Sequence, residues 1–170
     1  MPISGEEMLK FYRGPYSNAL SKLVRERNRK VTYHFRIHDE DGLWAECVEL
    51  AGCVTEGRDR VELEKNMHEA LNLYLEEPVS STVVFPAPAS IRPGRNVVAV
   101  GVDPSIAFSL QLRQLRLRHN MTQKEAAERL GMRNLYSYQR LERRSNPSLA
   151  TIKKIKNLFP DFSLDTVLGG

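Results

Sequence analysis

Residues 121–155 read MTQKEAAERLGMRNLYSYQRLERRSNPSLATIKKI, and this stretch decides how the C-terminal part of the chain folds. Thr122 followed by Glu125 is a capping box, which predicts that a helix begins directly after Thr122. Gly131 is the residue type that most often ends a helix, because it adopts a left-handed backbone at little cost. Asn146-Pro147-Ser148 is typical of a turn. The stretch therefore predicts a helix ending at Leu130-Gly131, a second helix over 134–143, and a third that begins near Leu149.

Further helices are predicted on both sides of this stretch. Residues 105–119 precede it as one helix. After it, apolar residues recur at Leu149, Ile152 and Ile155 until Pro160, and a short last helix is expected around 163–168. Residues 104–170 are therefore expected to form an all-α domain.

This pattern resembles the repressor-type helix-turn-helix of the phage repressor/Xre family over roughly residues 110–159. The residues that carry the resemblance are Thr122-Gln123, Ala126-Ala127, Leu130-Gly131, Leu141-Glu142 and Asn146-Pro147-Ser148-Leu149. The resemblance implies that Ala127 lets two helices approach closely, and that Arg116 and Glu142 form an ion pair. The stretch from Met132 to Glu142 is one residue longer than the family pattern, so the register of the recognition helix against DNA is open by about one position.

The resemblance also implies that helix 134–143 lies in the major groove of DNA. The side chains expected at base edges are Asn134, Tyr136, Ser137, Gln139 and Arg140, and those expected on phosphate are Gln123, Lys124, Arg133 and Arg144. One such helix covers half an operator site, which predicts a homodimer or a higher homo-oligomer. The alternative is a helical bundle used only for dimerisation. A net charge of +7 over residues 104–170, from 12 basic and 5 acidic residues, argues against it.

The middle of the chain has the opposite charge. Residues 31–103 carry 6 basic and 13 acidic residues, for a net −7, whereas residues 1–30 carry a net +4. Such asymmetry suggests domains with different partners. We predict an N-terminal helical extension over 1–30, whose apolar residues have helical spacing between 4 and 28, an acidic domain over 31–103 and a DNA-binding domain over 104–170.

The acidic region is predicted to be a two-layer α+β unit. Residues 31–38 alternate as a half-buried strand, Asp41-Gly42 supplies a hairpin turn, and residues 43–50 form the return strand. A short strand at 53–55 closes at Gly57. Asp59 and Glu62 begin an amphipathic helix to about Glu77, with His68 on its polar side. Residues 78–95 are rich in proline and predict an extended, unpacked connection, and residues 96–103 predict a buried strand.

This β-β-β-α-β region resembles HicB, the antitoxin of HicA–HicB toxin–antitoxin pairs, over about residues 31–102. The matching residues are Asp41-Gly42, the run Glu49-Leu50-Ala51-Gly52-Cys53-Val54-Thr55 with Gly57, Glu69-Ala70-Leu71 and Tyr74-Leu75-Glu76; the family more often has proline where Ala51 stands. The resemblance implies a truncated RNase H-like fold and an antitoxin that binds a HicA mRNA interferase and represses its own operon. The acidic residues expected to bind the toxin are Asp39, Glu40, Asp41, Glu46, Glu49 and Glu56.

Two other functions are the alternatives to an antitoxin. A metal-dependent nuclease needs clustered carboxylates, but Asp39 and Asp41 fall in a turn, and Glu46 and Glu49 are expected on opposite faces of one strand. We therefore expect no enzyme, no catalytic residues, no cofactor and no metal. The other alternative is a stand-alone helix-turn-helix regulator with a small-molecule-sensing or oligomerising N-terminal domain. The sequence has only two cysteines, no apolar run long enough to span a membrane and no signal-like N-terminus. We therefore predict a cytoplasmic protein without a membrane partner.

Overall fold

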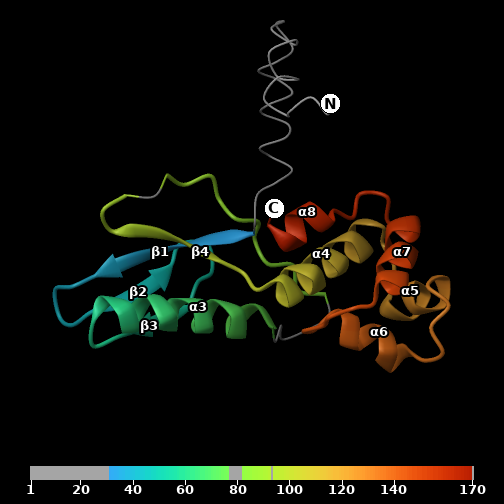
Figure 1. Cartoon of the computed structure of the whole chain (residues 1–170), viewed down its shortest axis with the longest axis horizontal. Helices are drawn as coiled ribbons and strands as arrows, with labels where there is room; N and C mark the ends of the chain where they lie inside the picture. Colours follow the sequence, from blue (N-terminus) through green and yellow to red (C-terminus); the bar gives the residue numbers. More distant parts are fainter. Residues whose placement is uncertain (1–30, 77–81, 93, 170) are drawn as a thin grey trace, which may run out of the picture.

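The computed structural model describes residues 31–76, 82–92 and 94–169, and Figure 1 shows an antiparallel sheet beside a group of helices. The helix expected over 4–28 lies outside the described residues. The elements of the first part run β1 (Thr32–His38), β2 (Trp44–Cys47), β3 (Val54–Glu56), α3 (Arg60–Glu76) and β4 (Val97–Gly101). The strands pair in the order β3-β2-β1-β4, and α3 covers one face of the sheet. The predicted β-β-β-α-β order and two-layer α+β plan are confirmed.

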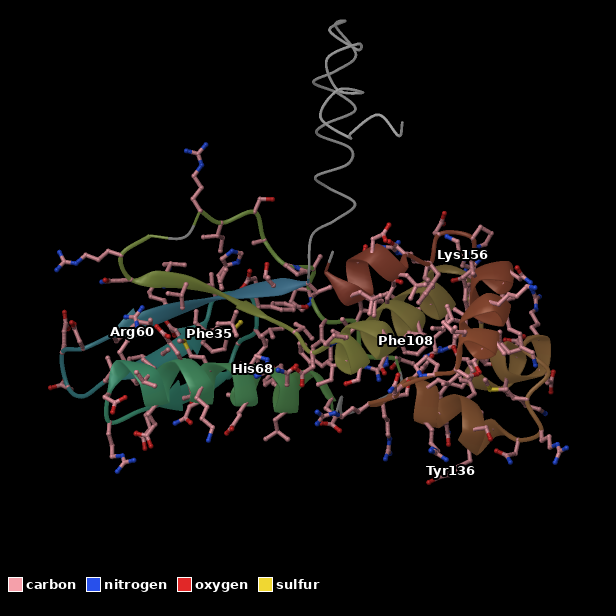
Figure 2. The ribbon with its side chains drawn as sticks, in the orientation of Figure 1. Phe35, Arg60, His68, Phe108, Tyr136 and Lys156 are labelled. Carbon is pink, nitrogen blue, oxygen red and sulfur yellow. The ribbon has the colours of Figure 1, made fainter. Side chains whose placement is uncertain are left out.

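Alternation in β1 fixes the face of the sheet that packs against α3. Tyr33, Phe35 and Ile37 are buried, and Leu63 and Met67 meet them from the helix. Phe35 lies between the two layers in Figure 2. Burying one such side chain contributes about 1.5–3 kcal/mol. The turn after β1 has Gly42 at φ +108°, as the Asp-Gly signal predicts.

The start of α3 differs in one bond from a complete capping box. The Asp59 carboxylate accepts a hydrogen bond from the Glu62 N–H at 2.8 Å, so Asp59 caps the helix. The Glu62 carboxylate, however, accepts from the backbone N–H of Arg58 at 2.8 Å rather than from that of Asp59.

The return strand is shorter than predicted. It ends at Cys47 rather than at residue 50, because the Glu49 carboxylate replaces a backbone acceptor in the ladder. Val48 N–H still donates to the carbonyl of His34, but the His34 N–H donates to Glu49 Oε2 at 2.9 Å. The His34 ring and the Ala89 N–H bind Glu49 Oε1 at 2.7 and 3.1 Å. The expectation that Glu49 lies on a strand is therefore wrong.

The connection and the last strand also differ from expectation. The connection does pack, because Phe85 is buried in the core and the Tyr33 hydroxyl donates to the carbonyl of Pro86. The last strand lies at a sheet edge, so Val100 is the buried residue within it, and Val102 just beyond it is fully buried. A run of β-branched residues indicates that a strand is apolar, but it does not show whether that strand lies at the centre or the edge of its sheet.

Glu49 makes stability depend on pH in a predictable way. Burial raises the pKa of its carboxyl, but the hydrogen bonds from His34 and Ala89 outweigh burial and hold that pKa below its ordinary value of 4.5. A depressed pKa stabilises the folded state above pH 4.5, and this contribution is lost as pH falls through the folded pKa. Glu49→Gln is expected to lower the free energy of unfolding by about 1–3 kcal/mol at pH 7.

The measurement is urea unfolding of the parent and the variant between pH 7 and pH 3. Their difference in unfolding free energy should shrink as pH falls below 4.5. Glu40→Gln, in the exposed turn, is the control and should leave the unfolding free energy nearly unchanged. A difference for Glu49→Gln that stays constant over this pH range would contradict the assignment.

The second part of the chain is helical. It comprises α4 (Pro104–Arg118), α5 (Gln123–Arg129), α6 (Leu135–Leu141), α7 (Leu149–Leu158) and α8 (Leu164–Leu168). Its core gathers buried residues of all five helices, among them Phe108, Ala127, Tyr138, Ile155 and Val167. No helix in the described part of the chain is both long and apolar enough to cross a membrane.

Helix α4 joins the two cores. Ile106 and Leu110 pack into the core of the sheet, whereas Phe108 and Leu112 pack into the helical core. Just before the helix, the Asp103 N–H donates to Asn72 Oδ1 at 2.8 Å. A boundary at residue 103 therefore falls at the start of α4, but the first turns of that helix also complete the core of the sheet.

Candidate nucleic-acid interface

Helices α5 and α6 are set by the local signals of the sequence. The Thr122 hydroxyl accepts from the Glu125 N–H at 3.1 Å, and the Glu125 carboxylate accepts from the Thr122 N–H at 2.7 Å. Hydrogen bonds from the Thr122 N–H and the Thr122 hydroxyl to this carboxylate lower the pKa of Glu125. Gly131 ends α5 at φ +65°, where the Gly131 N–H donates to the carbonyl of Glu128. The predicted start and end of this helix are confirmed.

Small side chains of α5 and large side chains of α6 share the core between the two helices. Ala126 and Ala127 are buried and allow the two helices to approach, as the sequence predicts for Ala127. Leu141 of α6 also lies in this core. Tyr138 is fully buried beside it, and the sequence reasoning missed this residue. Its spacing of three residues from Leu141 is the signal that could have found it.

A buried ion pair ties α4 to the end of α6. Arg116 Nε and Nη2 lie 2.5 and 3.0 Å from the two carboxylate oxygens of Glu142, and both side chains are at most 3% exposed. This is the pair that the sequence resemblance implies. Burial lowers the pKa of the Arg116 guanidinium, but the hydrogen bond and charge of Glu142 outweigh it, so the pKa is raised.

Arg113 and Gln123 also bind Glu142, and Gln139 in turn binds Gln123. Arg113 Nη2 donates to the backbone carbonyl of Glu142, and burial lowers the pKa of its guanidinium. Gln123 Nε2 donates to Glu142 Oε2 at 2.8 Å, and Gln139 donates to Gln123 Oε1 at 3.3 Å. Gln123, expected on phosphate, thus helps to satisfy a buried carboxylate.

The N-terminal half of α6 presents polar and aromatic groups to solvent. Tyr136 is 68% exposed and projects away from the body of the protein in Figure 2. Arg140 follows it by four residues, so the two lie on the same side of the helix, and both Arg140 and Ser137 are exposed. Asn134 is the N-cap rather than a helical residue, because its Oδ1 accepts from the Ser137 N–H at 2.8 Å. The expected start of this helix at residue 134 is one residue early, and its expected end at 143 is two residues late.

Uncompensated positive charge surrounds this exposed face. Lys124, Arg133 and Arg140 are exposed, and no acidic side chain pairs with them among residues 31–76, 82–92 and 94–169. Arg144 lies elsewhere. Its guanidinium is 3.4 Å from Asp103 and 3.6 Å from Glu76, at the junction with the sheet.

The acidic residues expected to bind a partner separate into two groups. Asp39, Glu40 and Asp41 are exposed in the turn after β1, and Glu46 and Glu56 are accessible on β2 and β3. Glu49 is instead buried, with its side chain 5% exposed.

Glu46 and Glu49 lie on the same face of the sheet, contrary to expectation. Glu46 contacts Arg36 and His38, and Glu49 contacts His34, which are alternate residues of β1. Over the described ranges, no three His, Cys, Asp or Glu side chains come together as a metal site.

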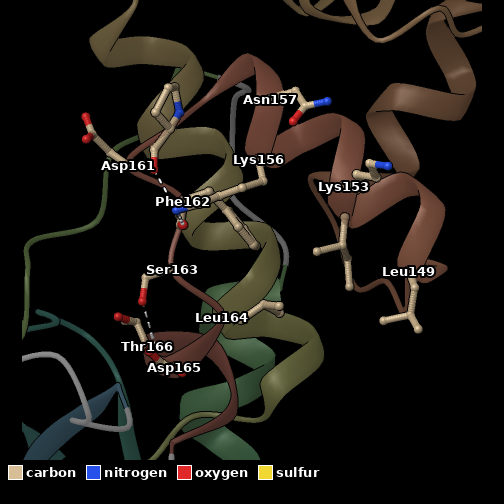
Figure 3. A pocket seen from close by; sticks show the side chains of 12 residues that line it. Leu149, Lys153, Lys156, Asn157, Asp161, Phe162, Ser163, Leu164, Asp165 and Thr166 are labelled. Carbon is tan, nitrogen blue, oxygen red and sulfur yellow. Dashed lines mark hydrogen bonds between the residues drawn. The ribbon is translucent and has the colours of Figure 1, made fainter.

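A groove separates α7 from α8 on another part of the helical unit (Figure 3). Lys156 closes the turn beneath it by donating to the carbonyls of Pro160 and Phe162. Leu149, 81% exposed, and Lys153 line the α7 wall, and Asp165 lines the α8 wall.

The comparison with protein families agrees with this geometry. Residues 112–166 match the helix-turn-helix family model. A search of curated proteins found no match to the chain. The C-terminal part is therefore a helix-turn-helix unit of the kind found in DNA-binding transcription regulators, in which α5 and α6 are the two helices around the turn.

Proposed function

We propose that this protein is the antitoxin of a HicA–HicB toxin–antitoxin pair, which neutralises a HicA mRNA interferase by direct binding and represses its own operon. In this proposal residues 31–103 form the toxin-binding domain, with a truncated RNase H-like fold, and residues 104–170 form the DNA-binding domain. The protein acts in the cytoplasm, where its toxin cuts mRNA.

One observation carries the proposal: an acidic sheet unit and a basic helix-turn-helix unit occur in one chain. The sheet unit has a net charge of −7 and exposes Asp39, Glu40, Asp41, Glu46 and Glu56. A toxin that cuts RNA must present basic surface to phosphate, so an acidic surface complements it in charge. A regulator of this toxin's operon also needs to read DNA, and the helix-turn-helix supplies that capacity.

On the DNA side, we assign base reading to the exposed face of α6 and phosphate binding to its basic surroundings. Tyr136, Ser137 and Arg140 face outward, whereas Gln139 is half-buried against Gln123. Lys124 and Arg133 supply charge at the start of α5 and before α6. Arg144 serves the junction with the sheet in this account rather than DNA.

We further propose that two copies associate through the α7–α8 groove. One α6 covers a half-site, so a palindromic operator requires two. A two-fold contact uses the same patch on both copies and must be self-complementary. The lining of the groove supports this assignment, because it has exposed leucines such as Leu149, and because Lys153 on the α7 wall and Asp165 on the α8 wall have opposite charges.

The proposal predicts that a small basic protein is encoded beside this gene, and that protein is the probe for the test. Its expression should arrest growth, co-expression of the full chain should relieve the arrest, and the two proteins should co-purify. A Tyr136→Ala/Arg140→Ala variant is the matched control, since it should still relieve the arrest while losing repression of the operon. If no neighbouring gene product arrests growth or binds the chain, the antitoxin proposal is wrong, and a stand-alone regulator becomes the better account.

A further inference from the structure

The outer face of the sheet, opposite α3, is only partly covered. Alternate residues of β1 point to this face, and the chain after α3 reaches it at His34, through the bond between Ala89 and Glu49. On the rest of this face, Trp44 is 36% exposed, Val48 is 39% exposed and Val54 is 57% exposed. These three side chains lie on the outer face of β2 and β3, with Glu46 between Trp44 and Val48, and we name them the Trp44 surface.

Trp44 is held in place before any partner arrives. Its ring stacks on that of His38, with centroids 4.1 Å apart and planes inclined by 14°. His38 Nε2 in turn lies 3.2 Å from Glu46 Oε1, and Trp44 pairs directly with His38 in the ladder. A fixed aromatic side chain loses little conformational entropy on binding, which favours it as an anchor in an interface.

The rim of the Trp44 surface is acidic. Asp39, Glu40 and Asp41 lie in the turn that joins β1 to β2, and Glu56 lies directly opposite Trp44 in the ladder. Arg36 also lies on this face, where its guanidinium pairs with Glu46 at 3.6 Å. Trp44 is thus an exposed aromatic side chain among carboxylates, and the charge of these carboxylates favours a basic partner.

We infer that the Trp44 surface is where the toxin docks, with Trp44 as the anchor and the acidic rim facing the toxin's RNA-binding surface. The inference rests on the proposed function. It assigns the interaction to the open sheet face rather than to α3 or to the buried Glu49.

The test measures binding of the full chain to the small basic protein that the proposed function predicts beside its gene, in a form inactivated for RNA cleavage. Trp44→Ala is expected to weaken binding by about 30-fold or more, the effect of losing an interface anchor. Leu73→Ala is the matched control, because Leu73 is 67% exposed on α3, and it should bind as the parent does. Glu56→Lys should weaken binding mainly by slowing association, and more strongly at low salt.

The possible outcomes separate the two claims. If the parent chain does not bind the neighbouring protein, the proposed function fails. If the parent binds and Trp44→Ala binds as tightly, the proposed function stands and the Trp44 surface is wrong. If Leu73→Ala weakens binding as much as Trp44→Ala, docking on α3 replaces it. Circular dichroism and DNA binding check that each variant folds, and if Trp44→Ala does not fold, unchanged binding by Glu56→Lys would overturn the inference.

Discussion

Glu142→Ala is expected to lower the free energy of unfolding by about 3–5 kcal/mol. Two arginines converge on this carboxylate: Arg116 binds both of its oxygens, and Arg113 binds the Glu142 backbone carbonyl. All three side chains are at most 5% exposed. Removing the carboxylate would leave two buried cations near one another without their counter-charge, which costs much more than the loss of an exposed ion pair.

Urea unfolding of the parent and the variant measures this effect. Glu142→Gln should fall between them, because an amide oxygen can still accept one of the hydrogen bonds while the negative charge is lost. Glu128→Ala is the control, since Glu128 is exposed on α5, and it should change the unfolding free energy by less than about 0.5 kcal/mol. A loss below about 1 kcal/mol for Glu142→Ala would contradict a buried cluster in solution.

Local signals predicted the elements whose ends are fixed by nearby residues. The capping box of Thr122 and Glu125, the left-handed Gly131 and the alternation of β1 each act within a few residues. Such features follow from backbone sterics and hydrogen bonding of one segment. They were sufficient for the element order of the sheet and the helices.

Features that depend on contacts distant in sequence could not be predicted from local signals. Glu49 accepts a hydrogen bond from the Ala89 N–H, 40 residues away. It therefore lies outside the strand, and its carboxylate is not part of the accessible acidic surface. Gln123 binds Glu142, and Arg144 binds Asp103 across 41 residues. A side chain's residue type shows that it can bind phosphate or carboxylate, but only the fold shows which partner it meets.

The two tyrosines of α6 illustrate the same limit. Tyr136 and Tyr138 are two residues apart, so they lie on nearly opposite sides of the helix. Tyr136 is 68% exposed and Tyr138 is fully buried, where burial and the charge of Glu142 raise the pKa of its hydroxyl. The sequence selected Tyr136 for DNA but assigned no role to Tyr138, although the register of α6 fixes both.

The second large effect concerns DNA recognition by α6. Tyr136→Ala and Arg140→Ala should each lower affinity for the operator by about 1–3 kcal/mol and have far less effect on scrambled DNA, because base contacts are made only on the operator. Lys124→Ala should weaken binding to both DNAs alike and reduce the salt dependence by about one unit per lost phosphate contact. Arg60→Ala is matched in charge and lies on the sheet unit, paired with Glu64, so it should change neither affinity.

The most direct test of this account is a binding titration of the parent and these variants on two duplexes at two salt concentrations. One duplex is the region upstream of the protein's own gene, where two half-sites about 34 Å apart are expected, and the other is a scrambled sequence of equal length. The account predicts that Tyr136→Ala and Arg140→Ala lose affinity selectively for the upstream duplex. Parent-like binding of both variants to that duplex would contradict the claim that α6 reads the operator.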